Sequence, residues 1–323
     1  MIFERFLKSK KLYMLFLLPF VAVTLAVVHF YTIHRACQPD DGVTLFPLQI
    51  IGSMSAEEAV TGGFIGLLLL AYALFFLNAK YKFLSQLTAL PSLVYILLTA
   101  GLIPAYGLGY LHVASLLLMV GFGGLQAAIL DSQSNSPVFN LGFFVCSAVI
   151  VYPKFILMAL WALCVLFFSG RSTVKDVVAL LLGFAVALFF TLFGYFWTDR
   201  LADFMPLFRE NLLSGEFLKF PDWSEALRWG ILLLLLLATL VKIISYYPMS
   251  VVNQRRGIAS LISLLFFMGL TLFVIPGIQM NFAYALSWPL AYLYAQYFIL
   301  QRFGWISDFF FLLLLFSCFT QLL

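Results

Sequence analysis

Charged residues are scarce in this sequence of 323 residues, at 10% of the chain, while 64% of the residues are hydrophobic and the mean hydropathy is +1.06. An ordinary soluble domain carries about 25% charged residues, so this composition excludes one. Ten-residue segments of alternating polarity, which are typical of outer-membrane barrels, are also absent. Long apolar runs such as WGILLLLLLATLV indicate helices instead. The sequence therefore predicts a single all-α polytopic membrane domain over residues 1–323.

Cysteine and histidine are equally sparse, with four and three residues, and no CxxC pair occurs. Three of the cysteines lie inside apolar runs, so neither a disulfide framework nor a metal framework is expected. His29 lies near His34 and Cys37, but no second cluster supports a metal there and we interpret His29 as a packing residue. The net charge of +4 gives no indication of nucleic-acid binding.

The placement of Lys and Arg predicts eleven transmembrane helices, with the N-terminus in the cytoplasm and the C-terminus outside. The first span is residues 11–33, interpreted as an uncleaved signal anchor. On this topology the inner side holds Lys/Arg 5, 8, 10, 11, 80, 82, 171, 175, 242, 255, 256 and 302, and the outer side holds 35, 154, 200, 209, 219 and 228. Ser55 with Glu58, and Thr173 with Asp176, are predicted helix caps.

Residues 138–169 are too long for one comfortable crossing, and Tyr152-Pro153-Lys154 stands in their middle. A single crossing would move every later loop to the other side and leave Arg171, Lys175, Arg255 and Arg256 outside, so we predict a short helix pair that turns at Lys154 on the outer face. Two outer segments accompany it, residues 34–59 and residues 198–228. In the second, Leu201, Phe204, Met205, Phe208 and Leu212 fall at helical spacing and predict an interfacial amphipathic helix.

Three passages carry a resemblance to a known family: residues 76–98, 138–168 and 174–201. Asn140 to Phe143 match a family segment Asn-Ala-Gly-Phe with one departure, at Leu141, and Thr198-Asp199 matches a helix end. Together the passages resemble an uncharacterised family of polytopic inner-membrane proteins of Bacteroidetes, over about the first two thirds of the chain. The resemblance implies a bacterial inner membrane and assigns no activity.

A second, weaker similarity is to glycosyltransferases of the C-type fold, which use lipid-linked sugars. Those enzymes place an acidic pair after the first helix, where Asp40 and Asp41 stand, and a cation in a short outer helix pair, where Lys154 stands. Only Gly142 of the family's glycine pattern is present. The similarity implies a polyprenyl-phosphate-linked donor.

Asp40 and Asp41 are accordingly the candidate catalytic residues, which could also hold a divalent cation; the competing interpretation is a plain PDDG turn. Lys154, Arg35 and Arg200 are the candidate phosphate or lipid-headgroup ligands. The alternatives are snorkelling for the first two and a solvated helix face for Arg200.

Three functions stay open: a glycosyltransferase acting on envelope glycoconjugates, a non-catalytic subunit of an inner-membrane envelope complex, and a lipid or solute transporter. The expected partners are the lipid bilayer and either a lipid-linked sugar or other envelope proteins. The scarcity of ionisable residues within the spans argues against ion-coupled transport.

Overall fold

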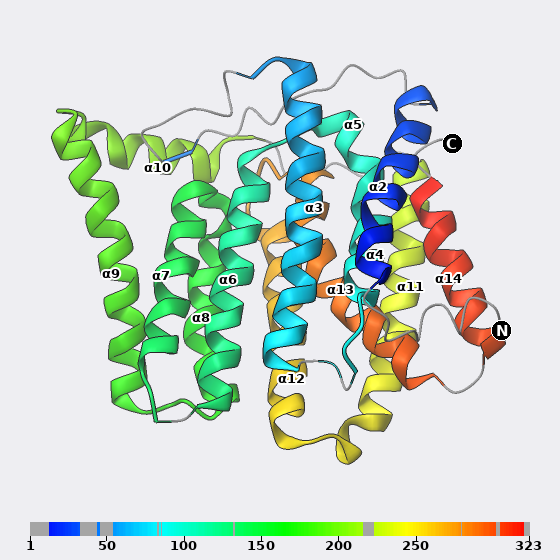
Figure 1. The fold of residues 1–323 in the computed structure, drawn as a ribbon. Coiled ribbons are helices and arrows are strands. Elements are labelled where there is room, and N and C mark those ends of the chain that lie inside the picture. The colour runs from blue at the N-terminus through cyan, green and yellow to red at the C-terminus, as the bar shows by residue number, and fades with distance from the viewer. Residues whose placement is uncertain are drawn as a thin grey trace.

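A computed structural model describes residues 13–32, 44–45, 54–82, 84, 86–131, 133–215, 223–278, 280–301 and 304–319. These residues form helices and no strand (Figure 1). The α-helices are α2 (Tyr13–Thr32), α3 (Ala56–Tyr81), α4 (Leu90–Thr99), α5 (Ile103–Tyr106), α6 (Tyr110–Leu130), α7 (Ser136–Val151), α8 (Ile156–Ser169), α9 (Val174–Trp197), α10 (Phe204–Leu213), α11 (Trp223–Tyr246), α12 (Val252–Val274), α13 (Ala283–Leu300) and α14 (Gly304–Phe319). Short 3₁₀ turns η2 (Ala100–Leu102), η3 (Pro153–Phe155), η4 (Leu201–Asp203), η5 (Tyr247–Met249) and η6 (Met280–Phe282) join several of them.

The helices stand roughly parallel and α10 lies across one end of the bundle, at the top of Figure 1. We call this the α10 end; η3, α5 and the start of α3 lie there too. The other end, at the bottom of the figure, holds the starts of α7, α9 and α12 and the ends of α3, α6 and α8. We call it the α12 end.

Among the described residues, five helices are long and apolar enough to cross a membrane: α3, α6, α9, α11 with η5, and α12. Five shorter apolar helical stretches accompany them, at residues 15–25, 90–102, 136–151, 153–169 and 304–318. Their outward faces are apolar, as on α9, where Leu182, Phe189, Phe190 and Phe196 are each more than half exposed. Exposing so much apolar surface to water is unfavourable, whereas contact between this surface and lipid tails is favourable. The fold is that of a multi-pass helical membrane protein.

Helices α4 and α13 form the centre of the bundle, because every residue of α4 and residues 283–298 of α13 are buried. Two tyrosines of α13 reach backbone carbonyls of neighbouring helices. The Tyr292 hydroxyl donates to the carbonyl of Leu74 at 2.6 Å, and the Tyr294 hydroxyl donates to the carbonyl of Leu232 at 2.8 Å. A backbone carbonyl can accept a second hydrogen bond, so these two bonds connect α13 to α3 and α11 without breaking either helix.

Glycines bring α6, α7 and α9 into backbone contact. A Cβ added to Gly142 of α7 would lie 2.2 Å from the carbonyl oxygen of Leu180, and one added to Gly183 of α9 would lie 2.3 Å from that of Phe139. On the other side of α7, a Cβ on Gly124 of α6 would lie 2.9 Å from the carbonyl oxygen of Pro137. Helices in lipid associate by close van der Waals packing, and small residues at the contact permit it.

Several local predictions are confirmed. The Ser55 hydroxyl oxygen accepts from the Glu58 N–H at 3.4 Å while the Glu58 carboxylate accepts from the Ser55 N–H at 2.8 Å, which is the expected capping box. Thr173 caps α9 through the Asp176 N–H at 3.2 Å. The predicted break of the 138–169 stretch is present, because α7 ends at Val151 and α8 begins at Ile156.

Two boundaries differ from the prediction. From hydropathy the apolar span is expected to start near residue 258, but helix α12 begins at Val252, about two turns earlier, and so includes Arg255 and Arg256. The segment IPAYGLG is expected to be an outer turn because of its Pro and Gly residues, but it begins with the single helical turn α5. At α12 the helix extends beyond the apolar run, because hydropathy indicates which solvent surrounds a segment and not which backbone hydrogen bonds it forms.

Candidate functional site

Lys154 lies in the break between α7 and α8. Tyr152 leaves the helix with an extended backbone, at φ −134° and ψ 92°, and Pro153 starts η3. Extended geometry is what a residue before proline prefers. The half-buried Lys154 ammonium donates to the carbonyl of Gly277, in the turn between α12 and η6. A residue 123 positions away in sequence is therefore its partner.

Two glycines let the end of α10 meet that same turn. Gly277 has φ +68°, and a Cβ there would lie 2.2 Å from the carbonyl oxygen of Ser214 and 2.8 Å from the Lys154 ammonium. Gly215 has φ +98°, and its Cβ would lie 2.5 Å from Cα of Gly277. Both the left-handed backbone and the close approach require glycine. Lys154, the end of α10 and the α12–α13 turn thus form one junction.

An open cavity of about 680 Å³ lies on the outward side of α10. Its lining within the described residues is Met205, Pro206, Arg209, Glu210, Leu213 and Ser214. Residues 205, 209 and 213 are four apart, so they share one face of the helix. Arg209 and Glu210 supply a cation and a carboxylate beside the apolar Met205 and Leu213. Such a lining suits a molecule with both an apolar and a polar part.

The inward side of α10 packs on a small apolar cluster. Phe204, Leu207 and Phe208 contact the buried residues Leu45, Cys146, Ile150 and Ala187. Leu45 is fixed further by its N–H, which donates to the carbonyl of Ile150 at 3.1 Å. Leu45 stands four residues after Asp41 in sequence. The predicted outer segment 34–59 is thereby attached, at Leu45, to α7 and α10.

Two of the predicted site residues, Lys154 and Arg200, lie within the described residues. Lys154 lies at the junction with α10, whereas Arg200 lies at the surface, paired with Asp203 at 3.1 Å with both side chains more than half exposed. Arg200 is not among the residues that line the cavity. Asp40, Asp41 and Arg35 lie outside the described residues, as does the side chain of His29.

The predicted amphipathic helix is present as η4 and α10, but the cavity pair Arg209 and Glu210 was not among the predicted site residues. A signal for them exists in the sequence, because Arg209 follows Met205 and precedes Leu213 by one turn each. Within the described part of the chain, no group of three or more His, Cys, Asp or Glu residues could hold a metal ion.

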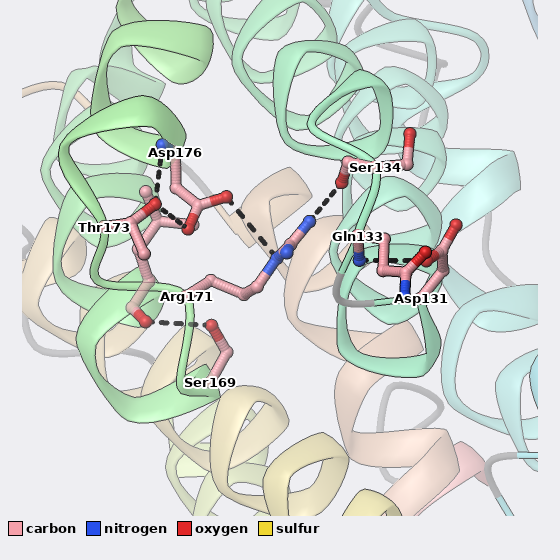
Figure 2. A network of polar contacts seen from close by, with 8 residues as sticks. Asp131, Gln133, Ser134, Ser169, Arg171, Thr173 and Asp176 are labelled. Atoms are coloured by element: carbon pink, nitrogen blue, oxygen red, sulfur yellow. Dashed lines mark hydrogen bonds and ion pairs between the residues drawn. The ribbon is translucent and has the colours of Figure 1, made fainter.

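A second polar group, at the α12 end, joins the α6–α7 loop to the α8–α9 loop (Figure 2). The guanidinium of Arg171 lies 3.5 Å from the carboxylate of Asp176, with both side chains almost fully buried, and donates to the carbonyl of Ser134. The Thr173 hydroxyl donates to the second carboxylate oxygen of Asp176 at 2.7 Å. The two buried charges are paired with each other, and through the Ser134 carbonyl they connect the two loops, which indicates a structural role.

The fold and the α10 cavity thus define a multi-pass helical membrane protein with an amphipathic helix across one end. Comparison with known proteins adds no closer identification, since no protein-family model, no curated protein and no solved structure matches the chain.

Proposed function

We propose that this chain is a glycosyltransferase of the bacterial inner membrane that uses a lipid-linked sugar at the α10 end, and that it belongs to the Bacteroidetes family it resembles. The proposed topology has eleven crossings with the α12 end in the cytoplasm. The described Lys and Arg residues near that end, 80, 82, 171, 175, 242, 255 and 256, support this orientation against 154, 200, 209 and 228 near the α10 end.

The observation that carries the proposal is the meeting of three segments at the α10 end. Lys154 contacts the turn that α10 also contacts, and Leu45 packs beneath α10 four residues after the acidic pair. The cavity on α10 then offers apolar contact for a lipid chain and Arg209 for a phosphate. A lipid-linked sugar is a substrate with both of these parts.

The proposed reaction transfers a sugar to an acceptor hydroxyl. The bond between the anomeric carbon and the phosphate oxygen breaks, and its electron pair leaves with the polyprenyl phosphate, beside the Arg209 guanidinium. A bond forms between the anomeric carbon and the acceptor oxygen, and the acceptor's proton passes to a carboxylate. Glu210 on the cavity and Asp40 or Asp41 in the outer segment are the proposed bases.

The test measures release of polyprenyl phosphate from a radiolabelled polyprenyl-phosphate sugar, using membranes that contain the expressed chain. Glu210→Gln is expected to lower the rate about 100-fold, the smaller end of what a general base contributes. Glu57→Gln is the matched control, because Glu57 is also exposed, at the start of α3 near the same end. Asp40→Asn and Asp41→Asn test the acidic pair in the same assay.

Two results would overturn the proposal: no release above membranes lacking the chain, or equal rates for Glu210→Gln, Asp40→Asn, Asp41→Asn and the control. An inactive chain that purifies with stoichiometric partner proteins would instead support a non-catalytic subunit.

A further inference from the structure

A second cavity, of about 190 Å³, lies at the α12 end, at the far end of the bundle from α10. Three helices supply its polar lining: Tyr81 and Lys82 at the end of α3, Gln126 of α6, and Asn253 and Gln254 at the start of α12. Its volume is well above what a single water requires. The rest of the lining within the described residues is Ile129, Leu130, Val251 and Gly257, so the lining is mixed and contains no carboxylate.

The side-chain amide of Gln126 is a hydrogen-bond donor that finds no acceptor among the described residues. Its side chain is 4% exposed, and its amide nitrogen has no hydrogen-bond partner among the described residues. A buried donor without an acceptor costs about 1–3 kcal/mol, and buried polar groups in folded proteins are nearly always paired. Because Gln126 lines the cavity, an acceptor atom on an occupant would satisfy this nitrogen.

The start of α12 adds further donors. Its N-cap residue, Val251, has no side chain that can accept from the first backbone N–H groups, and the helix runs for 23 residues. Asn253 and Gln254, in the first turn, line the cavity. Unpaired N–H groups and the positive end of the helix dipole both favour an anion at this position.

Lys82 adds a full positive charge to the lining. It is the C-cap of α3, held in the left-handed conformation at φ 49°, and its side chain is exposed. The carboxyl ends of α3 and α6 bring partial negative charge to the cavity, and a cation next to such an end offsets it. Lys82, Gln126 and the start of α12 together give the polar part of the lining hydrogen-bond donors and a positive charge.

We propose that this cavity binds a phosphate group, carried either by an anionic phospholipid headgroup or by a soluble phosphate ester. A phosphate supplies acceptor oxygens for the unpaired amide nitrogen of Gln126 and for the first turn of α12, and a negative charge complementary to that of Lys82. The site is separate from the α10 cavity and does not depend on glycosyl transfer.

The experiment uses the full chain, purified and delipidated in a neutral detergent. Three probes are titrated while thermal unfolding is followed: phosphatidylglycerol, glycerol 3-phosphate, and phosphatidylcholine as a zwitterionic comparison. Phosphatidylglycerol or glycerol 3-phosphate is expected to raise the unfolding temperature with saturation, and phosphatidylcholine is not. Stabilisation by phosphatidylglycerol alone assigns the phosphate to a lipid; stabilisation by glycerol 3-phosphate assigns it to a soluble ester.

Two variants make the test specific. Lys82→Asn removes the charge with a residue that tolerates positive φ, and Gln126→Leu removes the amide while nearly keeping the volume. Each is expected to weaken binding of the effective probe about tenfold, the loss expected for one hydrogen bond to a charged group. Lys175→Asn is the matched control, since Lys175 is exposed near the same end and does not line the cavity.

Gln126→Leu also separates binding from folding. Because it removes an unpaired buried nitrogen, the ligand-free protein should be as stable as the wild type or more so, while its affinity falls. The proposal fails if no phosphate probe binds, if phosphatidylcholine binds as well as phosphatidylglycerol, or if Lys82→Asn and Gln126→Leu bind as tightly as Lys175→Asn.

Discussion

Replacing Gly183 of α9 by alanine tests the backbone contact between α7 and α9. The new Cβ would lie 2.3 Å from the carbonyl oxygen of Phe139 and 2.7 Å from the backbone nitrogen of Phe143. Ordinary contact begins at 3.4 Å, so α7 and α9 must separate by about 1 Å. Neither atom can rotate away, because both belong to the backbone of α7.

The expected cost follows from two opposing terms. Overpacking a tight contact costs about 1–3 kcal/mol, and the upper value applies where two backbones must move. Alanine gains about 1 kcal/mol over glycine as a helix former. The net destabilisation of Gly183→Ala is therefore about 2 kcal/mol. Gly269→Ala, in α12, has no atom within 4 Å of its Cβ and should instead gain up to about 1 kcal/mol.

The assay is equilibrium unfolding in mixed detergent with increasing dodecyl sulfate, followed by tryptophan fluorescence, to which the fully buried Trp161 contributes. The two variants should differ by about 3 kcal/mol in free energy of unfolding, with the wild type between them. Adding Gly142→Ala to Gly183→Ala should cost less than the sum of the single changes, because one separation of α7 from α9 relieves both. Equal stability of Gly183→Ala and Gly269→Ala would refute the contact.

Two further predictions concern charged side chains. Arg171→Ala leaves the buried Asp176 carboxylate without its cation and should lower the free energy of unfolding by about 3–5 kcal/mol. Arg200→Ala removes an exposed pair and should lower it by less than about 1 kcal/mol. The same unfolding assay compares the two variants, and similar losses of stability would contradict the burial of the first pair. Lys154→Met removes a charged donor from the Gly277 carbonyl and should destabilise this contact by about 1.5–3 kcal/mol. Limited proteolysis at the α12–α13 turn checks the result. Unchanged cleavage of that turn would argue against the contact.

Much of the fold could be predicted from local sequence. The capping box at Ser55 and Glu58 and the Thr173 cap involve residues three apart, so their geometry follows from the helix itself. The break at Tyr152 and Pro153 follows from the conformation that proline imposes on its neighbour. The start of α12 could not be placed, because the polar residues 253–256 gave no apolar signal although their backbone is helical.

The candidate site could be predicted only in part. The outer segment 198–228 was recognised from the spacing of its apolar residues, and α10 lies within it. The contact between Lys154 and Gly277 could not be predicted, because the two residues are 123 positions apart and no local pattern in either segment indicates which segment lies beside it in the fold. The unpaired nitrogen of Gln126 was equally hidden, because burial and missing partners are properties of the packed bundle.

The sequence by itself determined that this is a helical membrane protein, because composition and apolar run length are set by the solvent in which the chain must fold. It also determined the helix caps and the break at Lys154, which depend on neighbouring residues. Only the tertiary structure decided that α4 and α13 form the centre, that glycines bring α7 against α9, and that Lys154 holds the α12–α13 turn. In lipid every apolar helix is equally well solvated on all sides, so partner choice comes from shape and hydrogen bonding between segments distant in sequence.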